Sequence, residues 1–397
     1  MLDSIYIGTS GLQAFSEGLK VIGNNVANLN TPGFKASNSV FSNMYFADSQ
    51  SGSGPQTGAA TQFGGGVTLS QTAVNFRVGE LRQTGNPLDL NVTGEGFFVT
   101  RDKDQSETIY TRAGQFEFSK DGHLVVRGTE RQVIGLSATG EQAPITLDGL
   151  RLNPPQPTAT VSLGGNLSSS VTDFSIASVK VIDSAGGEHS LTIKFTPKTG
   201  AAGTWTVAVM DGTTEVGTGE IKFAGSQPMP GFDNISINYA PTGVTASTIK
   251  LDFSKNVTSF DTGTSSSLAV SSSDGHAVGT LNKITFDADG TLALGYSNGQ
   301  TAKGAKVALA LFDSTAQLQP QGNSGFTYAA HDGMRIGAAS QGGFGNIGSS
   351  QIEGSNVDLA SEFSDLIVAQ RGYQASSRIV STASELLQDL FDMKGHR

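Results

Sequence analysis

The sequence predicts a mainly β chain of several nested, discontinuous domains, framed by an α-helix at each end. The chain has 397 residues, which is enough for two or three domains of about 100–200 residues each. Apolar residues repeat every seven positions only at the two ends, whereas the middle consists of short alternating runs separated by turn residues. We therefore expect antiparallel sandwiches or barrels between two terminal helices that pair in a coiled-coil-like axial domain.

The N-terminal helix is predicted by two lines of residues spaced by seven, which together form one apolar seam. The first line is Ile5, Leu12, Leu19 and Val26, and the second is Gly8, Phe15, Ile22 and Leu29. Four glycines fall in the same segment, and each costs about 1 kcal/mol relative to alanine in a helix. The helix is therefore expected to depend on tight packing, either with the C-terminal helix or with other subunits.

The C-terminal helix is predicted by a second set of residues spaced by seven. This line is Leu359, Leu366, Tyr373, Val380 and Leu387. A companion line begins at Phe363, is polar in the middle and ends at Phe391. On the opposite side lies a charged stripe, which consists of Arg371, Arg378, Glu385 and Asp392. The segment 355–358 has the pattern of a capping box and marks the start of the helix.

Between the helices, turn signals such as Asp211-Gly212 and Asn298-Gly299 separate short strands, and no helical pattern interrupts them. Low-complexity stretches rich in Gly, Ser and Pro mark the boundaries. The predicted parts are a terminal helical axial domain (1–35 plus 352–397), an extended or irregular connector (36–75), an inner β-domain (76–150 plus 276–351) and an inserted outer β-domain (151–275).

Composition excludes several classes of function. Lys and Arg number 25 and Asp and Glu number 35, which gives a net charge of −10, and no basic cluster exists that would bind nucleic acid. The absence of cysteine excludes disulfides and thiolate chemistry. No apolar run reaches the length of a membrane span, so we expect no membrane insertion. No cleavable secretory signal is recognisable at the N-terminus.

The sequence offers no catalytic or metal-binding constellation. The five histidines are scattered, and none has a metal-ligand spacing. The segment 287–290 resembles the start of a calcium loop but lacks the remaining ligands, so a hairpin turn explains it better. Paired carboxylates far apart along the chain are not visible in a sequence. The prediction is a protein without enzymatic activity, cofactor or metal.

Three segments resemble those of the bacterial flagellar rod and hook axial proteins. They are 24–35 (NNVANLNTPGFK), 86–99 (NPLDLNVTGEGFFV) with the runs after it, and 355–359 with 367–373 (IVAQRGY). The residues that carry the terminal signatures are Asn24, Asn25, Asn28, Asn30, Thr31, Gly33, Phe34, Gln370, Arg371, Gly372 and Tyr373. All members of the family share such segments, so the middle of the chain must distinguish among them.

The middle segments 179–193 and 295–301 resemble the additional segments of the hook members of this family. The resemblance implies a structural subunit that assembles head to tail into the curved, tubular flagellar hook, a flexible universal joint that transmits torque from rod to filament. It also implies an extracellular location, export by the flagellar type III apparatus without a cleaved signal peptide, and contact with rod, hook-cap and hook–filament junction proteins.

The helical seams are expected to drive this self-assembly. Their candidate residues are Ile5, Leu12, Phe15, Leu19, Ile22, Val26, Leu359, Phe363, Leu366, Tyr373, Val380 and Leu387. Two alternatives stay open at this point. A distal rod subunit of the same family would be shorter, and a β-rich surface adhesin or carbohydrate-binding protein would leave the terminal seams without a purpose.

Overall fold

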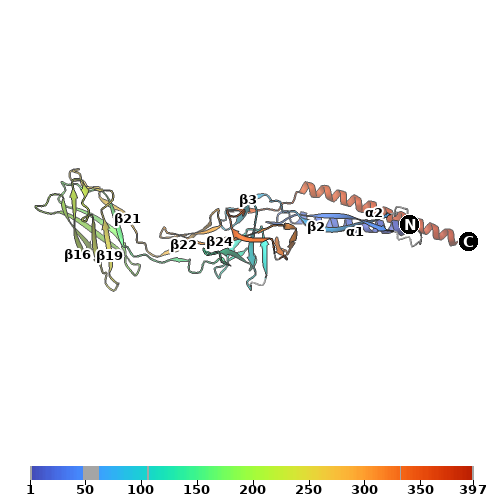
Figure 1. The fold of residues 1–397 in the computed structure, drawn as a ribbon, viewed down its shortest axis with the longest axis horizontal. Coiled ribbons are helices and arrows are strands. Elements are labelled where there is room, and N and C mark those ends of the chain that lie inside the picture. Colours follow the sequence, from blue (N-terminus) through green and yellow to red (C-terminus); the bar gives the residue numbers. More distant parts are fainter. Residues whose placement is uncertain (1, 48–61, 105–106, 331, 396–397) are drawn as a thin grey trace, which may run out of the picture. The chain divides into compact units, whose positions relative to one another are not determined.

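A computed structural model describes residues 2–47, 62–104, 107–330 and 332–395 (Figure 1). The chain divides into two compact units, each built from separate stretches of sequence. Unit 1 contains residues 1–147, 284–293 and 303–397, and unit 2 contains residues 148–283 and 294–302. The prediction of a mainly β chain with nested, discontinuous parts and a helix at each end is confirmed.

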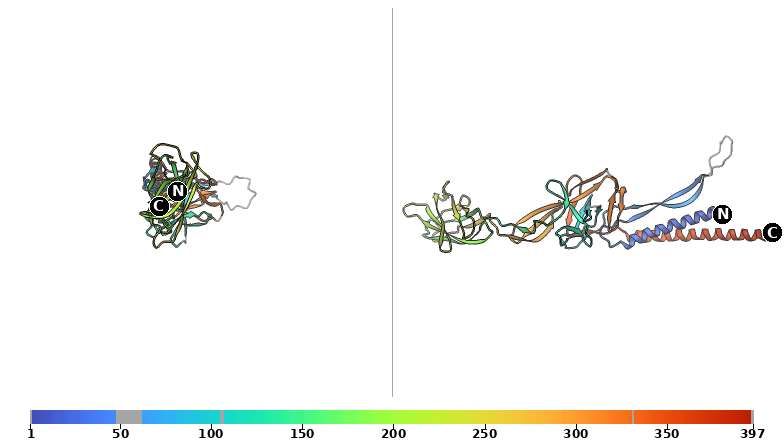
Figure 2. Two further views of the ribbon diagram at one scale, coloured as in Figure 1. Left: turned by 90° about the vertical axis from the view of Figure 1, so that its left-hand side faces the viewer. Right: turned by 90° about the horizontal axis from the view of Figure 1, so that it is seen from below.

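Two long helices form the ends of unit 1. Helix α1 spans Leu2–Ala27 and helix α2 spans Leu359–Gly395. They pack against each other and run side by side in the right-hand view of Figure 2. A long antiparallel hairpin of β1 (Ser37–Ala47) and β2 (Gln62–Val74) lies along α1.

This hairpin corrects the prediction for 36–75, which was an extended or irregular connector. The described strands pair in register from Ser37 opposite Val74 onward, with two bulges; residues 48–61 lie outside the described residues. The strands are rich in Ser, Gly, Asn and Thr, so their alternation is hidden from a reading based on hydrophobicity.

The β-part of unit 1 surrounds an aromatic core. Phe97, Tyr110, Phe312 and Phe326 are buried together, and Phe97 meets Phe312 edge to face with ring centroids 5.6 Å apart. Its strands, in chain order, are β3 (Leu81–Gln83), β4 (Leu90–Thr93), β5 (Phe97–Arg101), β6 (Thr108–Thr111), β7 (Phe116–Phe118), β8 (Leu124–Val126), β9 (Gln132–Leu136), β10 (Gln142–Pro144), β25 (Leu318–Pro320), β26 (Gly325–Tyr328), β27 (Met334–Ala338), β28 (Asn346–Ser349) and β29 (Gln351–Glu353). A 3-10 turn, η1 (Thr315–Gln317), precedes β25.

Unit 2 is a β-sandwich with one continuous apolar core. One sheet has the order β13-β14-β15-β16-β17, and the other contains β18, β19, β12, β20 and β21. Residues from both sheets, such as Val207 and Leu251, are buried in the same cluster. The strands of the sandwich are β12 (Thr160–Asn166), β13 (Phe174–Ile182), β14 (Glu188–Pro197), β15 (Thr204–Asp211), β16 (Thr214–Ala224), β17 (Gln227–Pro228), β18 (Asn234–Tyr239), β19 (Ser247–Asp252), β20 (Val257–Thr258) and β21 (Ala269–Ser273). Before them, β11 (Leu152–Asn153) pairs with the later strand β22.

One pairing in unit 2 departs from the expected antiparallel arrangement. Strand β12 pairs in parallel with both β19 and β20. Parallel neighbours require a long crossover connection, which is usually a helix. Here the whole opposite sheet, β13–β17, lies between β12 and β19 in the chain and serves as that connection.

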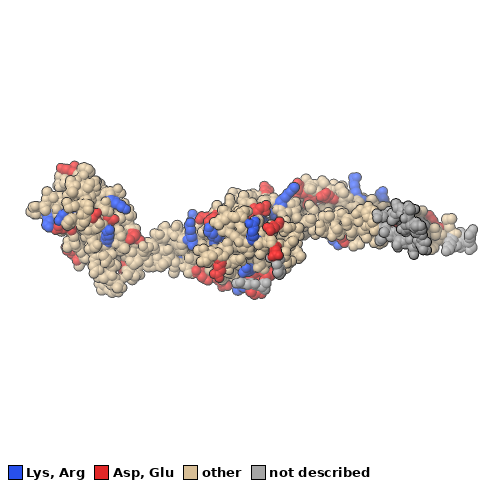
Figure 3. All heavy atoms as spheres, in the orientation of Figure 1, with Lys and Arg blue, Asp and Glu red and all other residues tan. Residues whose placement is uncertain are grey.

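Each of three further strands has some residues in unit 1 and some in unit 2. They are β22 (Gly279–Phe286), β23 (Thr291–Tyr296) and β24 (Thr301–Phe312). Most of the charged side chains on the face that Figure 3 shows lie over the β-part of unit 1, and much of the remaining surface is uncharged.

Candidate assembly surface of the terminal helices

The two terminal helices approach each other through small residues. Each glycine named here lies where a side chain would collide with the other helix. A Cβ atom added at Gly8 would lie 2.6 Å from Cγ2 of Val380, and one added at Gly11 would lie 2.5 Å from Oγ of Ser376. A Cβ at Gly372 would lie 2.5 Å from the Phe15 ring. The predicted dependence of the N-terminal helix on tight packing is therefore explained by contact with α2.

The buried side of α2 is a line of small or polar residues. Glu362, Ala369, Ser376 and Ala383 repeat every seven positions and are each less than 9% exposed. These residues replace the companion line that the sequence predicts. Phe363 and Phe391 on the predicted line are 54% and 67% exposed, so the contact between α1 and α2 of one chain does not use them. Of the buried line, Ser376 lies opposite Gly8 and Gly11 of α1.

The other predicted seam residues divide into three groups. Ile22 is buried, at 8% exposure. A second group is half-buried and consists of Ile5, Leu12, Phe15, Leu19, Val26, Leu366, Val380 and Leu387. Leu359 and Tyr373 are exposed at 37% and 41%. The chain's own helix pair therefore uses only part of the predicted apolar seam.

Helix α2 begins one turn later than the predicted capping box. Its cap is Asp358, whose Oδ1 accepts hydrogen bonds from the backbone N–H groups of Ala360 at 2.9 Å and Ser361 at 3.3 Å. Ser355 instead accepts a weak hydrogen bond from the N–H of Val357. The carboxylate of an aspartate cap accepts hydrogen bonds from the free N–H groups of the first turn. Its negative charge also interacts favourably with the positive end of the helix dipole.

Asn25 of the N-terminal signature connects three elements. Its Nδ2 donates to Oε1 of Glu362 on α2 at 2.9 Å and to the carbonyl of Ser37 at 2.8 Å. Its Oδ1 accepts from the N–H of Ser37 at 3.0 Å. Asn25 is 1% exposed, and burial raises the pKa of the Glu362 carboxyl above its usual range, with Asp365 and Asp358 adding to the effect.

The remaining signature residues after α1 shape a tight turn. Asn28 Nδ2 donates to the carbonyl of Asn24 at 2.9 Å, and Thr31 Oγ1 donates to Oδ1 of Asn28 at 3.0 Å. Gly33 has a φ of +67°, and a Cβ there would lie 2.4 Å from the backbone nitrogen of Ala113. Only glycine fits this position. Asn30 is exposed and Phe34 is half-buried beside this turn.

In the C-terminal signature, only Gly372 is explained by contacts within the chain, because it faces Phe15. Gln370 and Arg371 are exposed on α2, and no ion pair of the described residues includes Arg371. The sequence reasoning brings these residues together as one motif, whereas the structure gives them different surroundings.

A buried ionic cluster joins both terminal segments to the β-part of unit 1. Glu353 pairs with Lys35 through Oε1 and with Arg112 through Oε2 at 3.3 Å, and the three side chains are at most 4% exposed. Lys35 Nζ also donates to the carbonyl of Arg77 at 2.7 Å, and Arg112 donates to the carbonyls of Val92 and Gly94. Burial lowers the pKa of both Lys35 and Arg112, while Glu353 opposes that shift.

Sequence reasoning missed this cluster because its members are far apart along the chain. Asn356 adds a second connection that was also missed. Its Oδ1 accepts from the N–H of Ala36 at 2.7 Å, and its Nδ2 donates to the carbonyls of Asn75 and Arg77. The segment that precedes α2 is thus bonded to the residue before β1 and to the residues after β2, at the open end of the hairpin.

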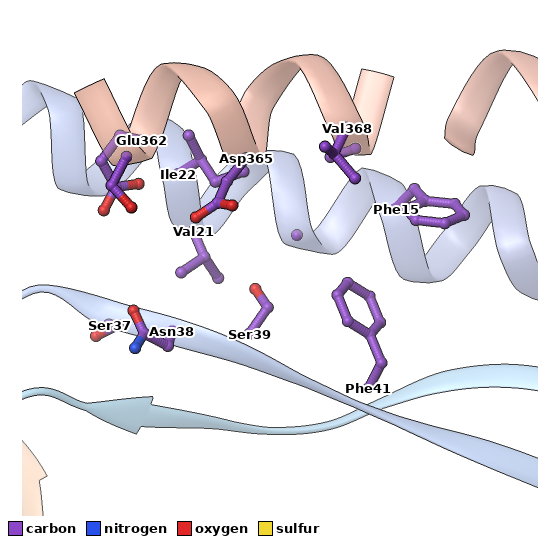
Figure 4. Close-up of a pocket in the computed structure, with 13 residues that line it drawn as sticks. Phe15, Val21, Ile22, Ser37, Asn38, Ser39, Phe41, Glu362, Asp365 and Val368 are labelled. Carbon is purple, nitrogen blue, oxygen red and sulfur yellow. The ribbon is translucent and has the colours of Figure 1, made fainter. Parts of the chain in front are cut away.

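A hollow of about 300 Å³ opens between α1, α2 and β1 (Figure 4). Phe15, Phe41 and Val368 form its apolar wall, while Glu362 and Asp365 contribute carboxylates. No lysine or arginine lines it. Among the described residues no group of three or more acidic or histidine side chains is placed to hold a metal ion.

Apolar side chains remain uncovered on the outside of the helices and hairpin. We call this set the terminal apolar surface. It consists of Tyr6, Ile7, Val40, Phe41, Tyr45, Leu359, Phe363, Ile367, Val368, Tyr373, Ile379, Leu386, Leu390, Phe391 and Met393, which are 37–80% exposed. Uncovered apolar side chains in such number mark an interaction surface. None of the helices in the described part of the chain is both long and apolar enough to span a bilayer.

The fold and this surface define a structural protein whose two ends pair as helices around inserted β-domains. Family models match three parts of the chain. They are described as Flagella basal body rod protein (residues 5–35), Flagellar hook protein FlgE/F/G D1 domain (residues 91–176) and Flagellar basal body rod FlgEFG protein C-terminal (residues 349–393).

The chain is also similar to curated flagellar hook proteins over nearly its whole length. It is 30% identical to FlgE of Salmonella typhimurium strain LT2 and 31% identical to FlgE of Escherichia coli strain K12, in each case over 97% of this chain and 98% of the relative. The chain therefore belongs to the flagellar hook protein family. A crystal structure of Helicobacter pylori flagellar hook protein FlgE2 matches 67% of this chain and 98% of that one, at 13% identity and a TM-score of 0.47.

Proposed function

We propose that this chain is the repeating subunit of a flagellar hook, which assembles head to tail with copies of itself into a curved tube. The observation that carries the proposal is the terminal apolar surface. Small residues such as Gly8, Ala369 and Ser376 fill the contact between α1 and α2 of one chain. Large apolar side chains such as Phe363 and Val368 remain exposed outside this contact. These are the side chains that neighbouring copies would cover.

Burial of these side chains supplies the driving force for assembly. A large apolar side chain gains about 1.5–3 kcal/mol when it is fully buried. A head-to-tail contact does not close on itself, so repetition of one such contact gives a helical polymer rather than a ring or a dimer. The half-buried seam residues, such as Leu12 and Leu19 on α1, would complete their burial in the same step.

The domain roles follow from this arrangement. Residues 1–35 with 352–397 would form the axial domain of the tube, 76–150 with 276–351 the inner β-domain, and 151–275 the outer β-domain. The hairpin within 36–75 would add its own contacts with neighbouring copies to those of the axial domain. Interfaces between such domains are small and polar enough to shift, which would let the tube bend as it rotates and act as a universal joint.

The family relationship supports further parts of the proposal. The subunit would work outside the cell, leave it through the flagellar type III apparatus without a cleaved signal peptide, and contact rod, hook-cap and hook–filament junction proteins. Its role would be mechanical and not enzymatic. Of the alternatives, a distal rod subunit is disfavoured because the full-length relatives are named hook proteins. An adhesin would leave the terminal apolar surface without a purpose.

Immunogold electron microscopy of detergent-extracted flagellar bases tests the proposal, with antibody raised against residues 171–255 of unit 2. Gold along the short curved segment outside the membrane is the expected result. Gold on the straight rod would assign the chain to the rod instead. Absence of gold from both, with the antibody shown to bind purified protein, would contradict the proposed function.

A further inference from the structure

The hollow between α1, α2 and β1 carries negative charge that its own lining does not balance. Glu362 and Asp365 contribute carboxylates, and no lysine or arginine stands among the lining residues. Asp365 is exposed and takes part in no ion pair of the described residues. Glu362 is buried, and its Oε1 accepts a hydrogen bond from the neutral amide of Asn25. The hollow therefore lacks a cation.

A hydroxyl group in the same hollow lacks a partner as well. Ser39 lines the hollow from β1, and its Oγ is buried without a hydrogen bond in the described part of the chain. In Figure 4 the Asp365 carboxylate and the Ser39 hydroxyl face each other across the hollow, with the rings of Phe15 and Phe41 at one end. A buried polar group without a partner is costly. A fitting occupant therefore carries positive charge, donates hydrogen bonds and packs against apolar groups.

An arginine side chain combines these properties. Its guanidinium is always charged, carries five N–H donors in a planar fork and can bind a carboxylate through two of them. It also packs on the faces of aromatic rings, and its carbon stem covers apolar surface. A lysine offers a single, strongly hydrated ammonium group instead. The lining of the hollow thus favours an arginine.

The described residues of the same chain do not supply this cation. Lys20, Arg371 and Arg378 are exposed on the two helices, and none of them lines the hollow. Lys394 is in the same helix as Asp365 but lies about 43 Å farther along its axis, at about 1.5 Å per residue. The segment 48–61, between β1 and β2, contains neither lysine nor arginine. We therefore look to a second copy for the occupant.

Arg371 is the arginine of the helix pair that best matches the hollow. It is exposed and takes part in no ion pair of the described residues. Ile367, one turn earlier on the same side of α2, is 52% exposed, so a cation and an apolar side chain are presented together. Arg378 has the polar Gln374 at the corresponding position. Only Arg371 therefore pairs a charge for the carboxylates with an apolar neighbour for the rest of the lining.

We propose that the hollow of one copy receives the side chain of Arg371 from α2 of a second copy, with Asp365 and Glu362 as the acceptors of its guanidinium. The inference rests on the proposed self-assembly and names one of its contacts. The arginine and the hollow are different surfaces, so the contact is heterologous and does not close on itself as a two-fold dimer.

One copy can use both surfaces at the same time. At 3.6 residues per turn, Arg371 points about 120° away from Asp365 around the axis of α2. A neighbour that fills the hollow and a neighbour that Arg371 enters therefore approach the helix from different sides. Each copy donates one arginine and accepts one, and the contact repeats from copy to copy as an open polymer requires.

Charge reversal tests the contact in polymers grown from the purified full-length chain. Arg371→Asp should raise the critical concentration for polymerisation by about tenfold, because an attractive pair becomes repulsive. Asp365→Arg should have a similar effect. The variant with both changes exchanges the partners and should return to within about threefold of the original chain.

Arg378→Asp is the matched control, because it makes the same change of charge at an exposed position on the same side of α2. It should alter the critical concentration by less than about twofold. Circular dichroism checks that each variant forms its helices.

Cross-linking identifies the partners, because the chain contains no cysteine of its own. Asn38 lines the hollow from β1 and is exposed. Arg371→Cys chains and Asn38→Cys chains are polymerised together, above the critical concentration of both, and treated with a short bismaleimide. A covalent dimer of one chain of each kind is the expected product. Polymers of either kind alone should give no dimer.

Three results would overturn the inference while leaving the proposed function intact. They are polymerisation of Arg371→Asp at the original critical concentration, absence of the mixed dimer, and a loss in Arg378→Asp that Arg371→Asp does not show. Dimers from Arg371→Cys chains alone would also overturn it, because two outer faces of α2 would then meet. Failure of the unmodified chain to polymerise would contradict the proposed function, and this contact with it.

Discussion

The Asn25 amide donates a hydrogen bond to the Glu362 carboxylate at 2.9 Å, across the two terminal helices of one chain. Both side chains are less than 9% exposed, and 337 positions separate them in the sequence. Asn25 also holds the first residue of β1 through both atoms of its amide. One asparagine thus fixes where α1, α2 and the hairpin meet.

The raised pKa of Glu362 makes this junction dependent on pH. A carboxyl whose pKa is higher in the folded than in the unfolded state stabilises the fold most below its unfolded pKa, near 4.5, and that contribution is lost as pH rises through the folded pKa. Glu362→Gln keeps an acceptor for Asn25 without the charge. We expect it to raise the melting temperature of the helices by roughly 2 °C or more at pH 7, with little change at pH 4.

Circular dichroism at 222 nm, recorded on the full chain between pH 4 and 8, measures this effect. Glu385→Gln removes an exposed carboxylate from the same helix and serves as the control, with no expected change in the pH profile of an unassembled sample. If Glu362→Gln lowered the melting temperature at pH 7, the carboxylate would be stabilising and the argument from desolvation would be wrong.

Two helix glycines should respond in opposite ways to alanine. Both substitutions gain about 1 kcal/mol of helix propensity. A Cβ at Gly23 meets nothing within 4 Å, so Gly23→Ala should stabilise the helix pair. At Gly372 the added carbon would lie 2.5 Å from the Phe15 ring, so Gly372→Ala should destabilise the pair by about 1–3 kcal/mol despite the propensity gain.

Thermal unfolding of the two alanine variants, followed by the helical signal, provides the comparison. Equal stabilisation by both would mean that the helices do not approach closely at Gly372. Because the chemical change is the same in both variants, a difference between them reports the packing alone.

The sequence predicted the terminal helices and one of their two contact lines, but not the other. Leu366, Val380 and Leu387 stand out because hydrophobicity is what periodicity analysis detects. Ala369, Ser376 and Ala383 are buried, and hydrophobicity does not reveal them. For Ser376 a signal was present in Gly8 and Gly11 of α1, which allow the two helices to approach closely there.

Contacts between distant segments were beyond sequence reasoning altogether. Lys35 and Glu353 are 318 positions apart, and Arg112 is 241 positions from Glu353. Each appears in the sequence as an ordinary charged residue, and only the fold removes all three from water. The hairpin of β1 and β2 was missed for a different reason, since its strands are largely polar and pack along a helix.

Unit 2 should lose stability in acid through one aspartate. Asp183 accepts hydrogen bonds from His189 at 2.8 Å and from the N–H groups of Ala185 and Gly187. The His189 contact is the largest cause of a pKa below the usual value of 3.8. A depressed carboxyl pKa gives stability that is present above about pH 4 and is lost as pH falls through the folded value.

Asp183→Asn should therefore destabilise unit 2 at pH 7 and make its unfolding less dependent on pH below 4. The tryptophan fluorescence of Trp205, which is buried in the core of unit 2 and is the single tryptophan of the chain, reports this unfolding. Asp173, which is exposed in the same unit, offers a matched substitution to asparagine. A pH profile unchanged by Asp183→Asn would place the acid sensitivity elsewhere.

The buried cluster around Glu353 should be the most sensitive site in unit 1. Removing its charge leaves Lys35 and Arg112 buried without a counter-charge, and breaking a buried pair in this way costs about 3–5 kcal/mol. We expect Glu353→Gln to lower the urea midpoint of unit 1 strongly. Asp121→Asn removes a solvent-exposed pair with Lys103 in the same unit. This substitution should change the free energy of unfolding of unit 1 by less than about 0.5 kcal/mol.

Intrinsic fluorescence does not report on unit 1 selectively, so hydrogen exchange is the better measurement. In Glu353→Gln the amide of Gly33, which donates to the Glu353 carbonyl at 2.8 Å, and that of Gly79, which donates to the Glu353 carboxylate at 3.0 Å, should exchange faster than in Asp121→Asn. Equal protection in the two variants would mean that Glu353 contributes no more than a surface carboxylate. Faster exchange at both amides would show that one buried charge holds the turn after α1 and the segment after β2 in place.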